Sequence, residues 1–130
     1  MTGAEASVLT RLKRRPEFLK VAATRRKWVA PGLILQARRH GADEADPPGA
    51  APLRVGFTVS RKVGNAVQRN RARRRLRAVA DDVLKAHAAG GHDLVVVGRQ
   101  ATLDRSYRDL IEDMKMALKR LGAFKDDEQR

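Results

Sequence analysis

Apolar and polar residues alternate along residues 53–60, LRVGFTVS. This period of two predicts a strand with one face in the core and one small, polar face. The polar face includes Gly56, where another backbone could approach closely. Residues 33–38 predict a second strand, preceded by Pro31 and Gly32, and the apolar run DLVVVG predicts a third that is buried on both faces. The core face of the first strand consists of Leu53, Val55, Phe57 and Val59.

Helical spacing of apolar residues predicts three helices. The first is short, because Pro16 stands at its first position and Phe18, Val21 and Ala22 share one side. The second covers about residues 66–87, and a pair of glycines closes it.

The third helix begins near Asp104 or Ser106, and Ser106 together with Asp109 resembles a capping box. Its apolar residues recur at helical intervals and form one stripe, which predicts that the helix packs on a sheet. The stripe consists of Tyr107, Leu110, Ile111, Met114, Leu118 and Leu121.

This order of elements predicts an α+β or α/β two-layer sandwich, with a small mixed sheet of about four strands and a long basic helix in a crossover between N- and C-terminal helices. We expect one domain, residues 11–122, since 130 residues suffice for one modest core. Residues 1–10 and 123–130 are expected to be flexible. So is the loop 41–52, whose prolines, glycines and acids cannot sustain a strand pairing.

Residues 60–80, SRKVGNAVQRNRARRRLRAVA, contain eight basic residues and no acidic residue. On a wheel of about 100° per residue, the helical part has a buried apolar stripe, so it is an anchored helix and not a disordered tail. The stripe consists of Ala72, Leu76, Val79, Ala80 and Val83. One flank carries Asn70, Arg73, Arg74 and Arg77, and the other carries Arg71 and Arg75.

The charge of the whole chain indicates which class of partner this helix binds. With 28 Lys and Arg against 15 Asp and Glu, the net charge is +13, which favours a polyanionic partner. Guanidinium groups pair bidentately with phosphate, so the bias towards arginine favours structured phosphate recognition over a merely solvated basic face. A second basic cluster surrounds Phe18 and Trp28, whose rings suit stacking of single-stranded bases or, alternatively, belong to the core.

Composition also excludes several classes of protein. No cysteine is present, so disulfides, thiolate catalysis and cysteine-bound zinc are excluded. No apolar run approaches the roughly 20 residues of a membrane span, and we expect a cytoplasmic protein with no membrane partner and no small-molecule substrate. Arginines within residues 11–28 would suit a transit peptide, although Glu5 and Glu17 argue against one. The three histidines lie far apart in unlike elements, and no catalytic constellation is visible.

Three stretches resemble, in order and spacing, the protein subunit of bacterial ribonuclease P: RLKRRPEF, RVGFTVSRKVGNAVQRNRARRRLR and DLVVVGR. The middle stretch is the specific one, because it fits the pattern K-x-G-x-A-x-x-R-N-x-x-R-R-x-x-R at Lys62 to Arg77. The resemblance covers about residues 11–121.

The resemblance implies an accessory subunit of an endoribonuclease that removes the 5′ leader from precursor tRNA. The catalyst would be the ribonuclease P RNA, with Mg²⁺ bound mainly by that RNA, and the partners would be this RNA and precursor tRNA with its 5′ leader. No catalytic residue is implied in the protein, and protein-bound metal positions stay open. The catalytic-RNA-binding residues would be Arg61, Lys62, Arg69, Asn70, Arg71, Arg73, Arg74 and Arg77. The leader-binding residues would be Arg11, Lys13, Phe18, Thr58 and Ser60.

The chain departs from the family pattern in one respect. Where the family often has further aromatic residues in the leader cleft, this chain has Ala22 and Gln36, so leader binding leans more on charge. The family also has an unusual left-handed crossover through the basic helix, which no feature of the sequence predicts.

The alternative function is a ribosomal or other structural RNA-binding protein with no role in cleavage. A helix-turn-helix DNA-binding protein conflicts with the flanking strands.

Overall fold

The structure, a computed structural model, describes residues 9–40 and 53–124. The segments predicted to be flexible therefore lie outside the described residues, except at positions 9, 10, 123 and 124. Positions 9 and 10 belong to a short strand, and Phe124 forms an isolated β-bridge with Ala88.

Five strands form one mixed sheet in the order β1-β4-β5-β3-β2. The two parallel pairs are β1 with β4 and β4 with β5, while β3 pairs antiparallel with both β5 and β2. The mixed sheet is as predicted, and the additional strands β1 and β2 have three residues each, too few to show an alternating pattern. The strands are β1 (Leu9–Arg11), β2 (Lys27–Val29), β3 (Leu33–Arg39), β4 (Leu53–Thr58) and β5 (His92–Gly98).

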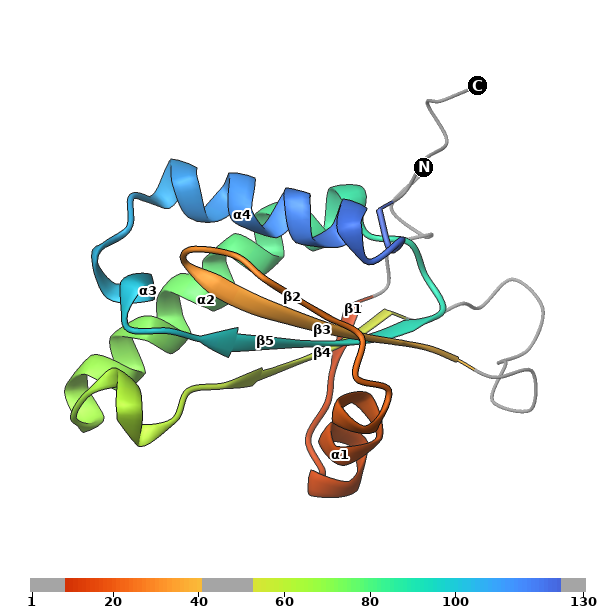
Figure 1. The fold of residues 1–130 in the computed structure, drawn as a ribbon, viewed down its shortest axis with the longest axis horizontal. Coiled ribbons are helices and arrows are strands. Elements are labelled where there is room, and N and C mark those ends of the chain that lie inside the picture. The colour runs from red at the N-terminus through yellow and green to blue at the C-terminus, as the bar shows by residue number, and fades with distance from the viewer. Residues whose placement is uncertain (1–8, 41–52, 125–130) are drawn as a thin grey trace.

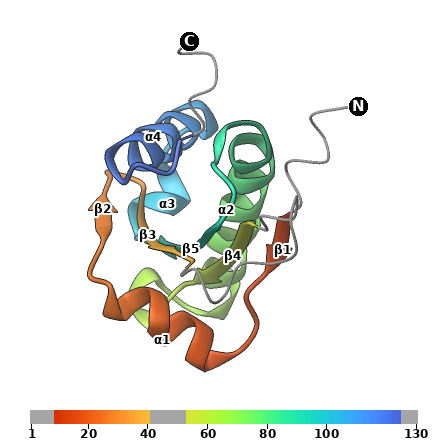
Figure 2. The same ribbon diagram turned by 90° about the vertical axis from the view of Figure 1, so that its right-hand side faces the viewer.

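Helices cover both faces of this sheet, but unequally. One face carries the long α2 (Ala66–His87), the one-turn α3 (Ala101–Asp104) and α4 (Tyr107–Arg120), and the other carries only the short α1 (Arg15–Ala23) (Figures 1 and 2). The sheet together with α2 and α4 on one of its faces forms the two-layer sandwich that the sequence predicts. Because α1 has nine residues, it covers only part of the second face.

The predicted apolar stripes form the main core between the sheet and the two long helices. All five predicted stripe residues of α2 are buried, with Leu84 in addition. In α4, Leu110, Met114 and Leu118 are fully buried. Tyr107 lies at the margin of this stripe, 38% exposed, since its hydroxyl donates to Asp82 of α2.

Some predicted helix contacts are different in the structure. Ala22, placed on the buried side of α1 by its spacing, is exposed, whereas Val21 is fully buried.

Burial, and then the neighbouring carboxylate of Asp82, raise the pKa of Tyr107 to about 12. Tyr107 therefore stays protonated and can serve as a hydrogen-bond donor between α4 and α2.

The connection from β4 through α2 to β5 is left-handed. β4 and β5 are adjacent and parallel, and in Figure 2 both run away from the viewer with α2 above them. The chain passes from β4 up to α2 and down to β5 on the left of β4 (Figures 1 and 2). Nearly all such connections are right-handed, so the family resemblance predicts this feature and general strand geometry does not.

A buried carboxylate joins the ends of three strands on the α1 side of the sheet. Asp93 of β5 is 1% exposed and accepts two hydrogen bonds from Arg54 of β4, at 2.8 Å from Nε and 2.7 Å from Nη2. At the end of β3, His40 Nε2 lies 2.7 Å from Asp93 Oδ1, and Arg38 Nη1 lies 3.5 Å from Oδ2. Burial by itself would raise the pKa of Asp93, but the hydrogen bonds from Arg54 and His40 outweigh it and hold the pKa below the ordinary value.

Replacing Asp93 with Asn should lower the free energy of unfolding by about 3 kcal/mol, because Arg54, Arg38 and His40 would lose the buried carboxylate that they share. Urea denaturation at neutral pH measures this change. The matched control is Asp104→Asn at an exposed position, which should change the free energy by less than about 0.5 kcal/mol.

The pH dependence provides a second check of the same pair. The folded pKa of Asp93 lies below its unfolded value of 3.8, so its stabilising contribution is complete above that value and is lost as the pH falls through the folded pKa. The difference in stability between the unmodified chain and Asp93→Asn should therefore narrow at acidic pH. A difference that stays constant down to about pH 2 would contradict the assigned role.

Candidate nucleic-acid interface

The basic segment begins with a turn whose shape is fixed by side chains. Ser60 Oγ accepts a hydrogen bond from the Lys62 N–H at 3.3 Å and thereby caps the 3₁₀ turn Arg61–Val63. Asn65 and Gln68 then form a capping box at the start of α2, because each side chain accepts from the other residue's N–H, at 2.9 and 2.8 Å. Two successive caps thus set the direction in which α2 leaves the sheet.

The buried stripe of α2 determines where its arginines point. Arg69 and Arg73 are half-buried: Arg69 donates to the Gly64 carbonyl at 3.2 Å, and Arg73 donates to Asn70 Oδ1 at 3.1 Å. These contacts hold both guanidinium groups near the start of the helix. The exposed members of the predicted RNA-binding set are Arg61, Lys62, Asn70, Arg71, Arg74 and Arg77.

Arg75 has a structural role that the helical wheel did not reveal. Its Nε donates to the Thr102 carbonyl at 2.9 Å, and its Nη2 donates to the Arg105 carbonyl. Arg75 therefore ties α2 to the short α3 and the residue after it. Of the two arginines predicted on that flank, only Arg71 is exposed.

The second sheet face has a small core of its own beneath α1. Leu12, Val21 and Val95 are its buried members, and Phe18 packs against them. Phe18 also occupies the space above Gly56 of β4, where an added Cβ would lie 2.5 Å from two ring carbons. The sequence predicts a close approach at Gly56, and the approaching group is this ring instead of the expected backbone.

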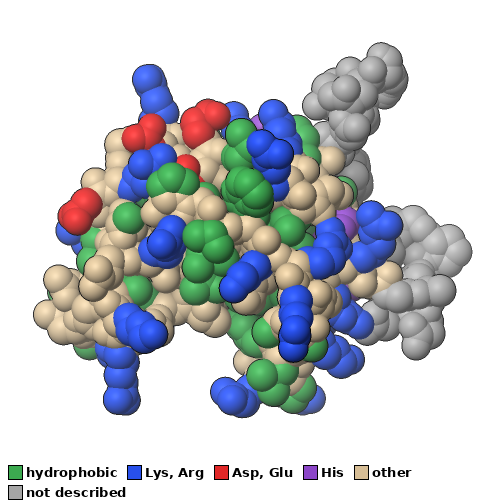
Figure 3. All heavy atoms as spheres, in the orientation of Figure 1, with side chains coloured by type: hydrophobic (Ala, Val, Ile, Leu, Met, Phe, Trp, Pro, Cys, Tyr) green, Lys and Arg blue, Asp and Glu red, His purple; other side chains and the backbone are tan. Residues whose placement is uncertain are grey.

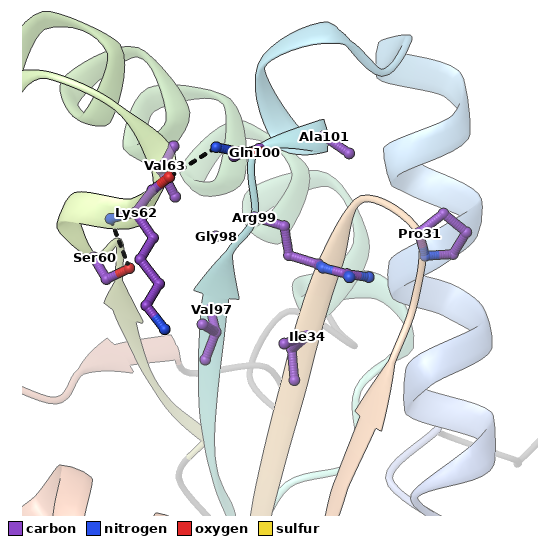
Figure 4. Close-up of a pocket in the computed structure, with 10 residues that line it drawn as sticks. All are labelled: Pro31, Ile34, Ser60, Lys62, Val63, Val97, Gly98, Arg99, Gln100 and Ala101. Atoms are coloured by element: carbon purple, nitrogen blue, oxygen red, sulfur yellow. Dashed lines mark hydrogen bonds between the residues drawn. The ribbon is translucent and has the colours of Figure 1, made fainter.

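A pocket of about 950 Å³ lies on the same sheet face, beyond α1 (Figure 4). Ile34 of β3 and Val97 of β5 form an apolar part of its lining, and the long side chains of Lys62 and Arg99 extend on either side of Val97 (Figure 4). The lining residues are Pro31, Ile34, Ser60, Lys62, Val63, Val97, Gly98, Arg99, Gln100 and Ala101.

Hydrogen bonds hold the side chain of Arg99 and the backbone of Lys62 in place at this pocket. Arg99 Nη1 donates to the Ala30 carbonyl at 2.6 Å, and the Arg99 N–H donates to Thr102 Oγ1 at 2.9 Å. Across the pocket, Gln100 Nε2 donates to the Lys62 carbonyl at 3.0 Å. The pocket is therefore an organised concave surface with an apolar lining and two cations, which suits an anionic ligand that carries flat apolar groups.

The structure brings most of the predicted leader-binding residues to this face. Ser60 lines the pocket, and Thr58 is exposed and in register with Val97. Phe18 lies farther along the same face. Lys13 is exposed in the link between β1 and α1.

Arg11 does not join this group. It pairs with Val55, whose side chain belongs to the main core, and its guanidinium lies 5.3 Å from the centre of the Phe57 ring. Since residues in register share a sheet face, Arg11 is on the α2 side.

Eight of the ten lining residues were not among the predicted site residues: Pro31, Ile34, Val63, Val97, Gly98, Arg99, Gln100 and Ala101. The signal that could have found Arg99 and Gln100 is the GRQ sequence, which begins with the last residue of the buried strand β5, because side chains at the end of a strand lie at the edge of the sheet. Only the fold shows that this edge lies next to the start of α2.

Basic side chains dominate the surface that contains α1. In Figure 3, Lys and Arg are spread over α1 and the nearby strand ends, whereas acidic side chains gather over the first half of α4. Within residues 9–40 and 53–124, no group of three or more His, Cys, Asp or Glu side chains could hold a metal ion. In the same ranges, no helix is both long enough and apolar enough to cross a bilayer.

An anchored arginine-rich helix beside an open sheet face with an apolar lining and a cationic wall defines a nucleic-acid-binding protein. The ribonuclease P family model matches residues 7–122. The chain therefore belongs to the ribonuclease P protein family.

Individual relatives agree with this assignment. The chain is 57% identical to the ribonuclease P protein component of Paramagnetospirillum magneticum over 119 residues, which are 92% of this chain and 87% of that protein. It is 44% identical to the ribonuclease P protein component of Ruegeria pomeroyi over 121 residues, 92% of each chain. The chain is thus a protein component of ribonuclease P, the endoribonuclease of tRNA 5′ maturation, and its partner is ribonuclease P RNA.

Solved structures share the fold. The Staphylococcus aureus ribonuclease P protein superposes with a TM-score of 0.69 at 23% identity, covering 88% of this chain and 97% of that one. The Thermotoga maritima ribonuclease P protein gives a TM-score of 0.65 at 23% identity, covering 85% and 94%. At this identity the likeness concerns the fold, including the mixed sheet and its flanking helices.

Substituting Gly56 with Ala should displace the Phe18 ring and lower the free energy of unfolding by about 1–3 kcal/mol, as expected for overpacking. Thermal or urea unfolding measures the change. The control is the same substitution in a Phe18→Leu background, where the smaller side chain leaves room for the new methyl group. An equal loss in both backgrounds would show that the cost at Gly56 does not arise from Phe18.

Proposed function

We propose that α2 and the turn before it bind ribonuclease P RNA, while the open sheet face holds the 5′ leader of precursor tRNA beside it. The observation that carries this proposal is the pocket of about 950 Å³, because its wall contains Lys62 and its far side contains Arg99. Lys62 belongs to the turn Arg61–Val63 that precedes the basic helix. A strand of RNA in the pocket would therefore meet the surface that binds the catalytic RNA.

The exposed arginines of α2 suit a folded RNA. They stand on a helix that the sheet holds rigidly, so their guanidinium groups can pair with phosphates at fixed spacing. Arg69 and Arg73 are partly held by neighbouring acceptors, which reduces the entropy lost on binding. Arg11, on the same side of the sheet as α2, suits contact with this RNA better than contact with the leader.

The sheet face on the α1 side suits a single strand. Single-stranded RNA exposes bases to apolar and aromatic surfaces and phosphates to cations. This face offers Ile34 and Val97 together with Lys62 and Arg99 in the pocket, and Phe18 farther along. Ala22 is exposed and Gln36 is half-buried, so neither supplies a stacking ring. Leader binding by this chain accordingly depends strongly on charge.

The protein's part in the reaction is to bind and orient RNA. Magnesium ions would be held mainly by the catalytic RNA and would supply the nucleophile and charge stabilisation for cleavage. The described acidic side chains with the most buried positions, Asp93 and Asp113, are already bound to arginines, so they do not fit a magnesium site. The cations of α2 and Lys62 would instead offset phosphate repulsion where the two RNAs meet. We place this activity in the cytoplasm.

Arg74→Ala should weaken binding to ribonuclease P RNA and reduce the slope of log affinity against log salt by about 0.7–0.9, the value for one lost phosphate contact. Arg73→Ala should act in the same direction. Binding titrations over a range of salt concentrations measure the slope. Lys85→Ala, at the other end of α2 and exposed, is the control and should leave the slope nearly unchanged. An unchanged slope for Arg74→Ala would mean that this arginine is only solvated.

Phe18→Leu should weaken the holoenzyme's binding of leader-bearing precursor tRNA by about 1–3 kcal/mol, the contribution of one stacked base. Leucine retains apolar contact with Val21 and Val95 but has no aromatic face. The measurement is the affinity for precursor tRNA and for mature tRNA, side by side. Equal losses for the two would show that Phe18 serves only the core.

A further inference from the structure

We infer that Arg54 is a positioning residue for leader recognition, which acts through Glu17 and Asp93 without touching RNA. The inference rests on the proposed leader site. Arg54 lies on β4, two residues before Gly56, and faces α1. Its guanidinium joins two carboxylates, that of Asp93 in the sheet and that of Glu17 in α1. We refer to these three residues as the Glu17–Arg54–Asp93 bridge.

The sheet end of the bridge is rigid. Asp93 is 1% exposed and receives two bonds from Arg54 in a bidentate arrangement. His40 and Arg38 also contact this carboxylate, from the end of β3. Because a planar guanidinium bound at two atoms has a fixed orientation, the third nitrogen, Nη1, points in a defined direction.

That third nitrogen holds the beginning of α1. Arg54 Nη1 donates to Glu17 Oε2 at 3.2 Å, while Glu17 Oε1 accepts from the N–H groups of Lys13 and Arg14 at 2.9 and 3.0 Å. These backbone hydrogen bonds lower the pKa of Glu17, and the nearby Arg54 acts in the same direction. One carboxylate therefore both caps the first turn of α1 and attaches it to the sheet.

The bridge fixes the position of the residue that the leader site needs. Phe18 directly follows Glu17 and packs over Gly56. On α1, the ionic contact at Glu17 and the ring contact at Phe18 are thus adjacent in the chain. On β4, the ionic contact at Arg54 and the ring contact at Gly56 are two residues apart. Farther along, Thr24 Oγ1 donates to the Ala37 carbonyl at 3.1 Å and holds the end of α1. Without the bridge, α1 would stay attached at its end, but its first turn and Phe18 could shift relative to the pocket.

The decisive test uses two variants that change the net charge in opposite directions. Glu17→Gln removes a negative charge and Arg54→Met removes a positive charge, and both break the bridge. Reconstituted holoenzyme with each variant should bind leader-bearing precursor tRNA about fivefold more weakly, which corresponds to part of one stacking contact. Affinity for mature tRNA, and affinity of the protein for ribonuclease P RNA, should stay within about twofold.

The control is Arg39→Met, which removes the same charge as Arg54→Met from an exposed residue on the opposite face of the sheet. It should leave the preference for leader-bearing substrate unchanged. The double variant Glu17→Gln with Arg54→Met should lose no more than either single variant, because both act through one bridge.

Opposite effects of the two single variants would overturn the inference. If Arg54 contacted the leader directly, Glu17→Gln would release Nη1 from its carboxylate partner and tighten leader binding. If Phe18→Leu reduces leader preference but both bridge variants leave it intact, the leader site stands and the positioning role fails. If Phe18→Leu also leaves the preference unchanged, the proposed leader site itself is wrong.

Discussion

The packing of the apolar stripe of α2 against the sheet is the interaction on which the rest of the structure depends. Six arginines stand within residues 69–77 of this helix, and their mutual repulsion opposes a compact state. Burial of Leu76, Val79 and Leu84 contributes about 2 kcal/mol for each side chain. This burial anchors the helix, and it also determines which arginines face outward.

The unequal cover of the sheet has a functional consequence. The main core needs both long helices, so one face is closed. On the other face, α1 is held by a small apolar cluster, by the Phe18 ring over Gly56 and by the Glu17–Arg54–Asp93 bridge. The uncovered remainder of that face becomes a pocket with a cationic wall. A short helix on one side therefore leaves room for a strand of RNA beside the anchored arginines.

Much of this arrangement follows from the sequence, because periodicity is a local property. The bounds of α2 and the cap at Ser106 are confirmed, since the stripe and the capping residues lie within the same segment. The role of Arg75 could not be predicted, because its acceptors belong to α3 and the residue after it. Likewise, Lys62 and Arg99 line one pocket because they follow the adjacent parallel strands β4 and β5, and no local pattern in the sequence predicts that pairing. Spacing also placed Ala22 on the buried side of α1, but Phe18 and Val21 face the small core and Ala22 is exposed.

In the proposed function, the protein holds the leader next to the catalytic RNA. The most direct test is cleavage of precursor tRNA at low magnesium by ribonuclease P RNA from the source organism, with and without this protein. Two substrates are compared, one with a leader long enough to cross the sheet face and one with its leader cut to a single nucleotide. If the sheet face holds the leader, the protein should stimulate cleavage of the first substrate much more than that of the second. Equal stimulation of both, or none of either, would contradict it.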